Sequence, residues 1–171
     1  MKKVYLIGSL RNPDVPEVGN RIRELGFDVF EDWFSAGKIA DDSWKLYEQA
    51  RGHTYKEALQ GRAAVHVFGF DKHHLDTSDI GVLMLPAGKS GHLELGYLIG
   101  QGKPGYVLFD SRFNEDSTRW DCMYQFAKEV FFDIEELLDE LRLVAPPHPS
   151  TLSTDTIVKA LRWLGRRGAY D

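Results

Sequence analysis

The sequence predicts an α/β protein built on an open, parallel β-sheet. Apolar runs at residues 4–7 and 80–85 show no polar–apolar alternation, which is typical of strands buried on both faces. Between such runs, apolar residues recur at helical spacing, and glycine or proline residues mark the turns. Strands that alternate with helices along a chain favour a parallel sheet covered by its crossover helices.

Five strands and the helices between them can be placed from these patterns. We expect strands at residues 4–7, 28–30, 80–85, 105–109 and 130–132. Helical spacing predicts helices at residues 18–25, 42–59 with a break near Gly52, 91–102, 134–143 and 154–164. Residues 62–75 suit a strand or a helix, and we favour a helix. For five strands, the leading arrangement is a flavodoxin-like (Rossmann-like) sheet of order 2-1-3-4-5 with C-terminal helices.

Composition restricts the class of protein. The chain has 171 residues, of which 43% are hydrophobic and 27% charged, and its net charge is −5. These values suit one globular domain, and the absence of a basic block argues against a nucleic-acid polymer as partner. The single cysteine, Cys122, forms neither an internal disulfide nor a metal cage, so we expect a cytoplasmic protein without a metal or cofactor. The apolar run at the N-terminus is too short for a signal segment or a membrane span.

The chain divides into a main domain and a tail. We expect the domain to span residues 1–145. Pro146, Pro147 and Pro149 then interrupt the helical pattern, and residues 146–171 are expected to form a linker and a helix. This last helix would pack on the same domain or on a partner subunit.

The predicted topology directs attention to one edge of the sheet. In the order 2-1-3-4-5, the switch point lies between strands 1 and 3, and ligands bind outside the carboxyl ends of the strands there. Residues 8–11 and 86–94 form the two loops at that point. Gly8, Gly88 and Gly91 suit a close approach of backbone to ligand, although they form no known phosphate-binding motif.

Glu94 is the first candidate for chemistry. If Ser90 caps the helix, Glu94 lies in its first turn, where the helix dipole favours an ionised carboxylate. Such a carboxylate can attack an anomeric carbon or stabilise a positively charged transition state. The competing interpretation is that Glu94 only stabilises the start of the helix.

Two further residues could act with Glu94. Asp71 can reach the same pocket from the preceding helix or loop, and a buried Tyr5 hydroxyl in the first strand could orient a carboxylate. Residues 33–44, which include Trp33 and Trp44, are a candidate lid, although aromatic residues in such a segment more often belong to a core.

Three motifs resemble the nucleoside 2-deoxyribosyltransferase family, which includes the related 2′-deoxynucleoside 5′-phosphate N-hydrolases. They are VYLIGSLR at residues 4–11, the stretch from Asp71 to DIGVLMLP at 79–86, and ELGY at 94–97 followed by GKP at 102–104. The resemblance covers about residues 3–135 and implies a flavodoxin-like fold. It implies that Glu94 is the nucleophile, that Tyr5 orients it, and that Asp71 helps to protonate the base. It also implies a homo-oligomer in which a neighbouring subunit supplies Asp121, with Met123 two residues on, near the sugar 5′ position.

The resemblance leaves the substrate and the acceptor open. Ser9, Arg11 and Ser90 match positions that favour a 5′-phosphate, whereas the carboxylate of Asp121 would repel a phosphate and suit a free 5′-hydroxyl. The leading function is transfer of a deoxyribosyl group from a nucleoside to a free base. The alternatives are hydrolysis of a nucleoside or nucleotide N-glycosidic bond, and a non-catalytic nucleotide-binding module.

Overall fold

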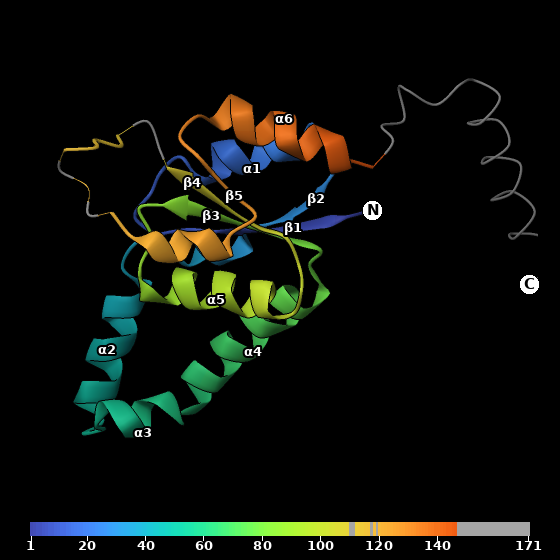
Figure 1. The fold of residues 1–171 in the computed structure, drawn as a ribbon. Coiled ribbons are helices and arrows are strands. Elements are labelled where there is room, and N and C mark those ends of the chain that lie inside the picture. Colours follow the sequence, from blue (N-terminus) through green and yellow to red (C-terminus); the bar gives the residue numbers. More distant parts are fainter. Residues whose placement is uncertain (110–111, 117, 119, 147–171) are drawn as a thin grey trace, which may run out of the picture.

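The computed structural model describes residues 1–109, 112–116, 118 and 120–146, which form a five-stranded parallel sheet (Figure 1). The strands have the order β2-β1-β3-β4-β5, so the predicted order is confirmed. Their bounds are β1 Lys3–Ile7, β2 Asp28–Phe30, β3 Ile80–Leu85, β4 Gly105–Phe109 and β5 Glu129–Phe131. The last strand lies one residue earlier than expected.

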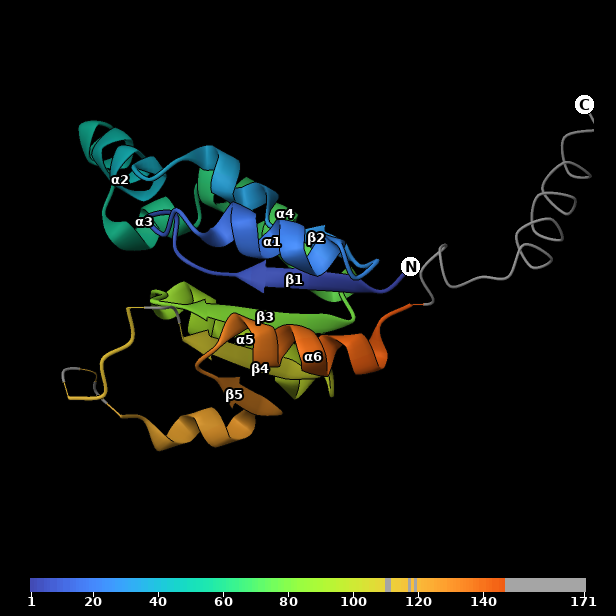
Figure 2. The same cartoon turned by 90° about the horizontal axis from the view of Figure 1, so that it is seen from above.

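Helices cover both faces of the sheet (Figures 1 and 2). Helices α1 (Val15–Arg23) and α6 (Ile134–Val144) pack on one face, and α4 (Arg62–Thr77) and α5 (Lys89–Gly100) lie on the other. Alternate residues of each strand serve the two layers, as the pleat requires. Val4 and Leu6 of β1 belong to the α1–α6 core, whereas Tyr5 and Ile7 belong to the core under α5.

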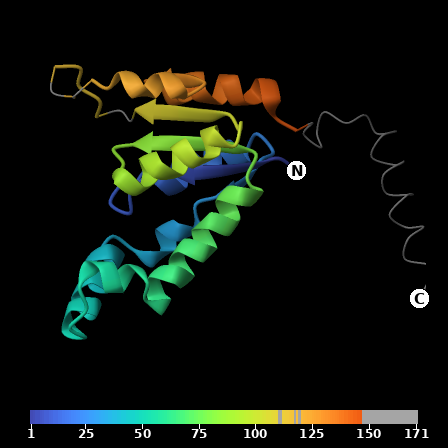
Figure 3. The same ribbon diagram turned by 60° about the horizontal axis from the view of Figure 1, so that its bottom comes forward.

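The segment between β2 and β3 projects away from the sheet as a helical arm (Figure 3). It contains a 3₁₀ helix (Asp32–Ala36), α2 (Ala40–Ala50), α3 (Tyr55–Leu59) and the first part of α4. Thr54 and Glu57 form a reciprocal capping box at the start of α3. The far end of α4 returns to the sheet, where the His74 ring stacks on Phe30 with 3.7 Å between ring centroids.

The structure resolves the ambiguous segment in favour of a helix. Residues 62–75 lie within α4, as predicted, and the helical stretch 42–59 is broken near Gly52. No helix among the described residues is long and apolar enough to cross a membrane. The expected helix of the tail lies outside the described residues.

Candidate active site

Three of the predicted residues lie close enough for their charges to interact. Tyr5 is on β1, Asp71 is in the middle of α4, and Glu94 is in α5. Tyr5 is only 1% exposed. Burial, then the charges of Glu94 and Asp71, raise the pKa of the Tyr5 hydroxyl, and burial, then Asp71, raises the pKa of Glu94. One strand and two helices therefore bring these groups together from distant parts of the sequence.

The start of α5 is set by close packing on the sheet. A Cβ added at Gly91 would lie 3.0 Å from Ile7 Cγ2 and 3.1 Å from Leu83 Cδ1, so the helix backbone lies directly on β1 and β3. A side chain at this position would push the helix away from the sheet. Gly91 therefore serves packing that fixes the course of α5, and hence the place of Glu94.

The prediction that Glu94 lies in the first turn of its helix is wrong. The helix begins at Lys89 with Gly88 as its N-cap, so Ser90 is inside the helix and Glu94 falls in the second turn. The helix dipole acts mainly within the first turn and is therefore not the main influence on this carboxylate. Burial has the opposite effect on its charge, because a carboxylate shielded from water is more easily protonated.

The two carboxylates are both difficult to ionise. Burial, and then repulsion by Asp71, raises the pKa of Glu94 to about 7. Burial raises the pKa of Asp71 to about 6. The expectation of a fully ionised Glu94 is thus replaced by two neighbouring carboxyls that both titrate close to neutral pH.

The orienting role of Tyr5 stays a prediction. Among the described residues, no hydrogen bond joins the Tyr5 hydroxyl to Asp71 or Glu94. Burial is the largest influence that raises the pKa of Tyr5, so its hydroxyl stays protonated and can act as a donor. A protonated phenol beside two carboxylates can donate to whichever of them is ionised.

The first loop lies at the carboxyl end of β1. Ser9 Oγ accepts a hydrogen bond from the Arg11 backbone N–H at 3.2 Å. The Arg11 guanidinium forms an ion pair with Asp42 at 2.9 Å, and both side chains are more than half exposed. The start of α2 thus holds the Arg11 side chain of this loop.

Trp33 packs against the carboxyl end of β1. Its indole N–H donates to the Leu6 carbonyl at 2.9 Å, and a Cβ added at Gly8 would lie 3.4 Å from its ring. The lack of a side chain at Gly8 is therefore explained by packing against its neighbours within the protein, and it need not indicate a bound ligand. The Trp33 end of the candidate lid is anchored to the core, and the role of residues 33–44 as a lid stays a prediction.

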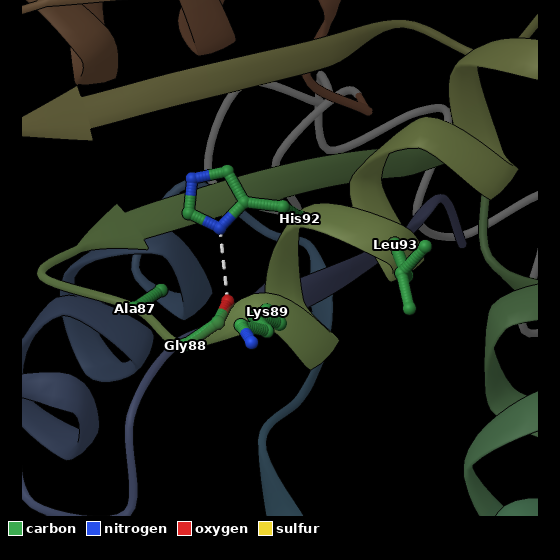
Figure 4. Close-up of a pocket in the computed structure, with 5 residues that line it drawn as sticks. All are labelled: Ala87, Gly88, Lys89, His92 and Leu93. Carbon is green, nitrogen blue, oxygen red and sulfur yellow. Dashed lines mark hydrogen bonds between the residues drawn. The ribbon is translucent and has the colours of Figure 1, made fainter.

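A shallow hollow lies at the start of α5 (Figure 4). Ala87, Gly88, Lys89, His92 and Leu93 line it, and an added Cβ at Gly88 would meet no atom within 4 Å. The His92 ring contacts the Gly88 carbonyl at 2.9 Å and the Tyr124 hydroxyl at 3.0 Å. Glu94 does not line this hollow, so it is a neighbour of the carboxylate pair and not its pocket.

Asp121 and Met123 lie apart from the carboxylate pair. Asp121 caps a 3₁₀ helix (Cys122–Phe126) by accepting a hydrogen bond from the Met123 backbone N–H at 2.9 Å. Asp121 also lines a cavity of about 470 Å³ beyond the ends of β4 and β5, whose walls include Phe109 and Phe132. The predicted contribution of Asp121 to a neighbouring subunit's site is untested by a single chain.

Sequence reasoning missed one network near the site. Tyr97, one turn after Glu94, donates a hydrogen bond to Asp76 of α4 at 2.6 Å. The ELGY motif contains Tyr97, but nothing in the sequence identifies its partner. Within the described residues, no group of three or more His, Cys, Asp or Glu side chains could hold a metal ion.

Solved structures of other proteins share the fold of this chain. Comparisons with protein-family models and with curated proteins find no match. Among solved structures, a 2-deoxyribosyltransferase from Bacillus psychrosaccharolyticus matches with a TM-score of 0.52 at 17% identity, over 79% of this chain and 89% of that one. The chain shares the fold of a 2-deoxyribosyltransferase. The CMP N-glycosidase BcmB of Clostridium botulinum matches with a TM-score of 0.44 at 15% identity, over 82% of this chain and 98% of that one.

Proposed function

We propose that the protein is an enzyme that cleaves the N-glycosidic bond of a (deoxy)nucleoside and transfers the sugar to another base. The observation that carries this proposal is the half-buried carboxylate pair of Glu94 and Asp71 beside Tyr5. Glycosidic bonds are commonly cleaved by two carboxylates, of which one attacks the sugar and the other transfers a proton. Both groups titrate close to neutral pH, and the reaction uses the arrangement in which Glu94 is ionised and Asp71 carries the proton.

Each carboxylate has one role in a two-step reaction. In the first step, a Glu94 carboxylate oxygen bonds to C1′ as the C1′–N bond breaks, and the departing base takes the bonding electrons and a proton from Asp71. In the second step, a ring nitrogen of the incoming base attacks C1′, Glu94 leaves as a carboxylate, and Asp71 takes the proton that this nitrogen loses. Water in place of the second base gives hydrolysis, so exclusion of water selects transfer.

A second copy of the chain is proposed to cover the site. Phe68 on α4, three residues before Asp71, and Leu93 on α5, next to Glu94 in sequence, are 66% and 76% exposed. Exposed apolar residues gathered around a site are typical of a surface that another protein covers. Homo-oligomerisation would bury them and would bring Asp121 and Met123 of a neighbouring subunit to the sugar.

The 5′ end of the substrate is proposed to lie between the first loop and the start of α5. Ser9, Arg11 and Ser90 could bind a 5′-phosphate there, because a helix N-terminus and a guanidinium both favour an anion. A phosphate would have to compete with Asp42 for Arg11, because these two residues form an ion pair. Comparing substrates with and without a 5′-phosphate measures the outcome of this competition.

One assay tests the proposal and its alternatives. The protein is incubated with deoxynucleosides or deoxynucleoside 5′-monophosphates, with and without a second free base, and the products are separated by chromatography. A new nucleoside indicates a transferase, and free base without exchange indicates a hydrolase. Binding without turnover indicates a binding module.

The Glu94→Ala variant provides the control within this assay. We expect its turnover to fall at least about 1000-fold, since the nucleophile is lost. Glu24→Ala, at an exposed position following α1, should retain full activity. Activity retained by Glu94→Ala would show that Glu94 is not the nucleophile.

A further inference from the structure

The two carboxylates of the site come from two helices whose separation has to be maintained. Asp71 is on α4 and Glu94 is on α5. Of the sixteen residues of α4, Leu75 alone is buried, so apolar packing holds this helix weakly. A helix with so little buried surface needs other contacts to fix its position, because burial of apolar surface supplies most of the energy of helix packing.

A polar network supplies such contacts between the two helices. The Tyr97 hydroxyl of α5 donates to Asp76 Oδ1 of α4 at 2.6 Å, and Gln101 Nε2 donates to the same oxygen at 3.4 Å. The Lys72 ammonium donates to Asp76 Oδ2 at 2.6 Å and also lies 5.3 Å from the centre of the Tyr97 ring. These donors lower the pKa of Asp76 to about 2, the Lys72 bond being the largest cause and the Tyr97 bond the next.

The end of α4 is fastened from the same side. The Lys103 ammonium, just after α5, donates to the Leu75 and Asp76 carbonyls at 2.9 and 2.8 Å. These carbonyls belong to the last turn of α4, where a cation is favourable. The network therefore joins α4 to α5 through both a side chain and the helix backbone.

The network is close to Glu94 along α5, and on α4 it holds the part of the helix that follows Asp71. Tyr97 follows Glu94 by three residues, which places both on one side of α5. Asp76 follows Asp71 by five residues, or about one and a half turns of α4. A small rotation or shift of α4 against α5 would thus change the distance between the two carboxylates.

We propose that Tyr97 and Asp76 are positioning residues, whose hydrogen bond fixes the distance between the Asp71 and Glu94 carboxylates. Neither residue has to touch the substrate. If the bond is lost, α4 moves away from α5, and Glu94 is less buried and farther from Asp71. Only the prediction for turnover rests on the proposed function; the prediction for carboxylate ionisation rests on the geometry alone.

The sign of the effect on Glu94 follows from its surroundings. The titratable groups that face it are the Asp71 carboxyl on α4 and the Tyr5 hydroxyl on β1, while β3 contributes apolar residues. Burial and repulsion by Asp71 both raise the pKa of Glu94, so loosening the helices weakens both influences. The carboxylate should then titrate at lower pH.

The test compares four variants by carboxyl-carbon NMR titration, by the pH dependence of kcat and by thermal unfolding. Tyr97→Phe and Asp76→Ala both remove the bond, whereas Asp76→Asn keeps an oxygen that accepts from Tyr97. Tyr106→Phe is the matched control: Tyr106 of β4 donates to Glu140 of α6 at 3.1 Å on the opposite face of the sheet.

We expect the Glu94 midpoint and the acid limb of kcat to fall by about half a pH unit or more in Tyr97→Phe and Asp76→Ala. In the same variants kcat should fall about 3- to 10-fold, since a slightly misplaced group slows the reaction. Asp76→Asn should restore most of both quantities. Tyr106→Phe should lower the unfolding temperature without moving the Glu94 midpoint.

The proposal is overturned if the Glu94 midpoint is unchanged or rises in both Tyr97→Phe and Asp76→Ala, whatever their unfolding temperatures. It is also overturned if Asp76→Asn behaves like Asp76→Ala, because the bond to Tyr97 would then be irrelevant. A wild-type protein without turnover would contradict the proposed function, and the NMR titration would still decide the role of the bond.

Discussion

Each face of the sheet carries a hydrogen-bonded trio of a tyrosine, a carboxylate and a lysine, and the two trios have different roles. On the α6 face, Tyr106, Glu140 and Lys128 form hydrogen bonds of 2.6 to 3.1 Å around a fully buried tyrosine. On the α5 face, Tyr97, Asp76 and Lys72 form a similar trio in the open. The first trio reinforces a complete layer, whereas the second holds α4, the loosely packed helix of the other, incomplete layer.

The layers differ in how much apolar surface they bury. Helix α6 buries Leu137, Leu138 and Leu141 against the sheet and α1. Helix α4 buries only Leu75 and leaves most of its apolar residues exposed. The complete layer therefore supplies stability, and the incomplete layer carries the ionisable groups, as expected where function limits packing.

The largest expected effect is on the incomplete layer. Asp71→Asn removes the proposed proton donor and the charge that repels Glu94, so turnover should fall about 100- to 10,000-fold. The pKa of Glu94 should fall below its value of about 7, because one of its two causes is gone. Turnover assays and a pH titration of Glu94 check both effects.

A weaker result would alter the interpretation of this face. If Asp71→Asn leaves turnover within a few-fold of the wild type, water and not Asp71 protonates the departing base. If the Glu94 pKa does not move, the two carboxylates are farther apart than the structure indicates.

The complete layer should respond in stability and not in activity. Leu137→Ala removes a fully buried side chain of α6 and should lower the free energy of unfolding by about 2–5 kcal/mol. Residual turnover per folded molecule should match the wild type, because α6 lies on the face opposite Glu94. Chemical denaturation and turnover of the folded fraction measure the two quantities, and a large loss of turnover at full folding would break the division between the layers.

The sequence predicted the fold because each strand of the sheet is marked locally. Continuous apolar runs at β1 and β3, separated by helical spacing, restrict the topology to one with crossover helices. Helix α4 was ambiguous for a physical reason: most of its apolar residues face away from the core, so their spacing does not report a buried stripe.

The sequence predicted that Tyr5, Asp71 and Glu94 would lie close together, but it did not predict their electrostatics. Ser90 is a residue type that favours the N-cap position, but the helix starts before it, at Lys89. Gly91, already within the helix, packs tightly on Ile7 and Leu83. Because the helix begins two residues earlier than predicted, Glu94 lies in the second turn, where burial affects its pKa more than the helix dipole does. The Tyr97–Asp76 bond links residues 21 positions apart, and a pairing of that kind depends on how two helices pack.

The smallest expected effect tests whether the ionised Glu94 of the incomplete layer lowers the stability of the folded protein. The pKa of Glu94 is raised from 4.5 to about 7 in the folded protein, so the folded state binds more protons than the unfolded state between these values. Stability from this group is therefore fully present below about pH 4.5 and is lost as pH rises through about 7. Glu94→Gln keeps the shape of the side chain without its charge. Its free energy of unfolding at pH 8 should be about 1–3 kcal/mol higher than that of the wild type.

The same variant should show little advantage at pH 4, where Glu94 is protonated in both states. Chemical denaturation of wild type and Glu94→Gln across pH 4–8 measures the difference directly. Glu140→Gln provides the contrast on the complete layer. Hydrogen bonding to Lys128 lowers the pKa of Glu140, so removing the Glu140 charge should give no gain in stability at pH 8. Equal stability of Glu94→Gln and wild type at pH 8 would mean that the folded protein accommodates the Glu94 charge without loss, and the incomplete layer would then differ from its counterpart in exposure alone.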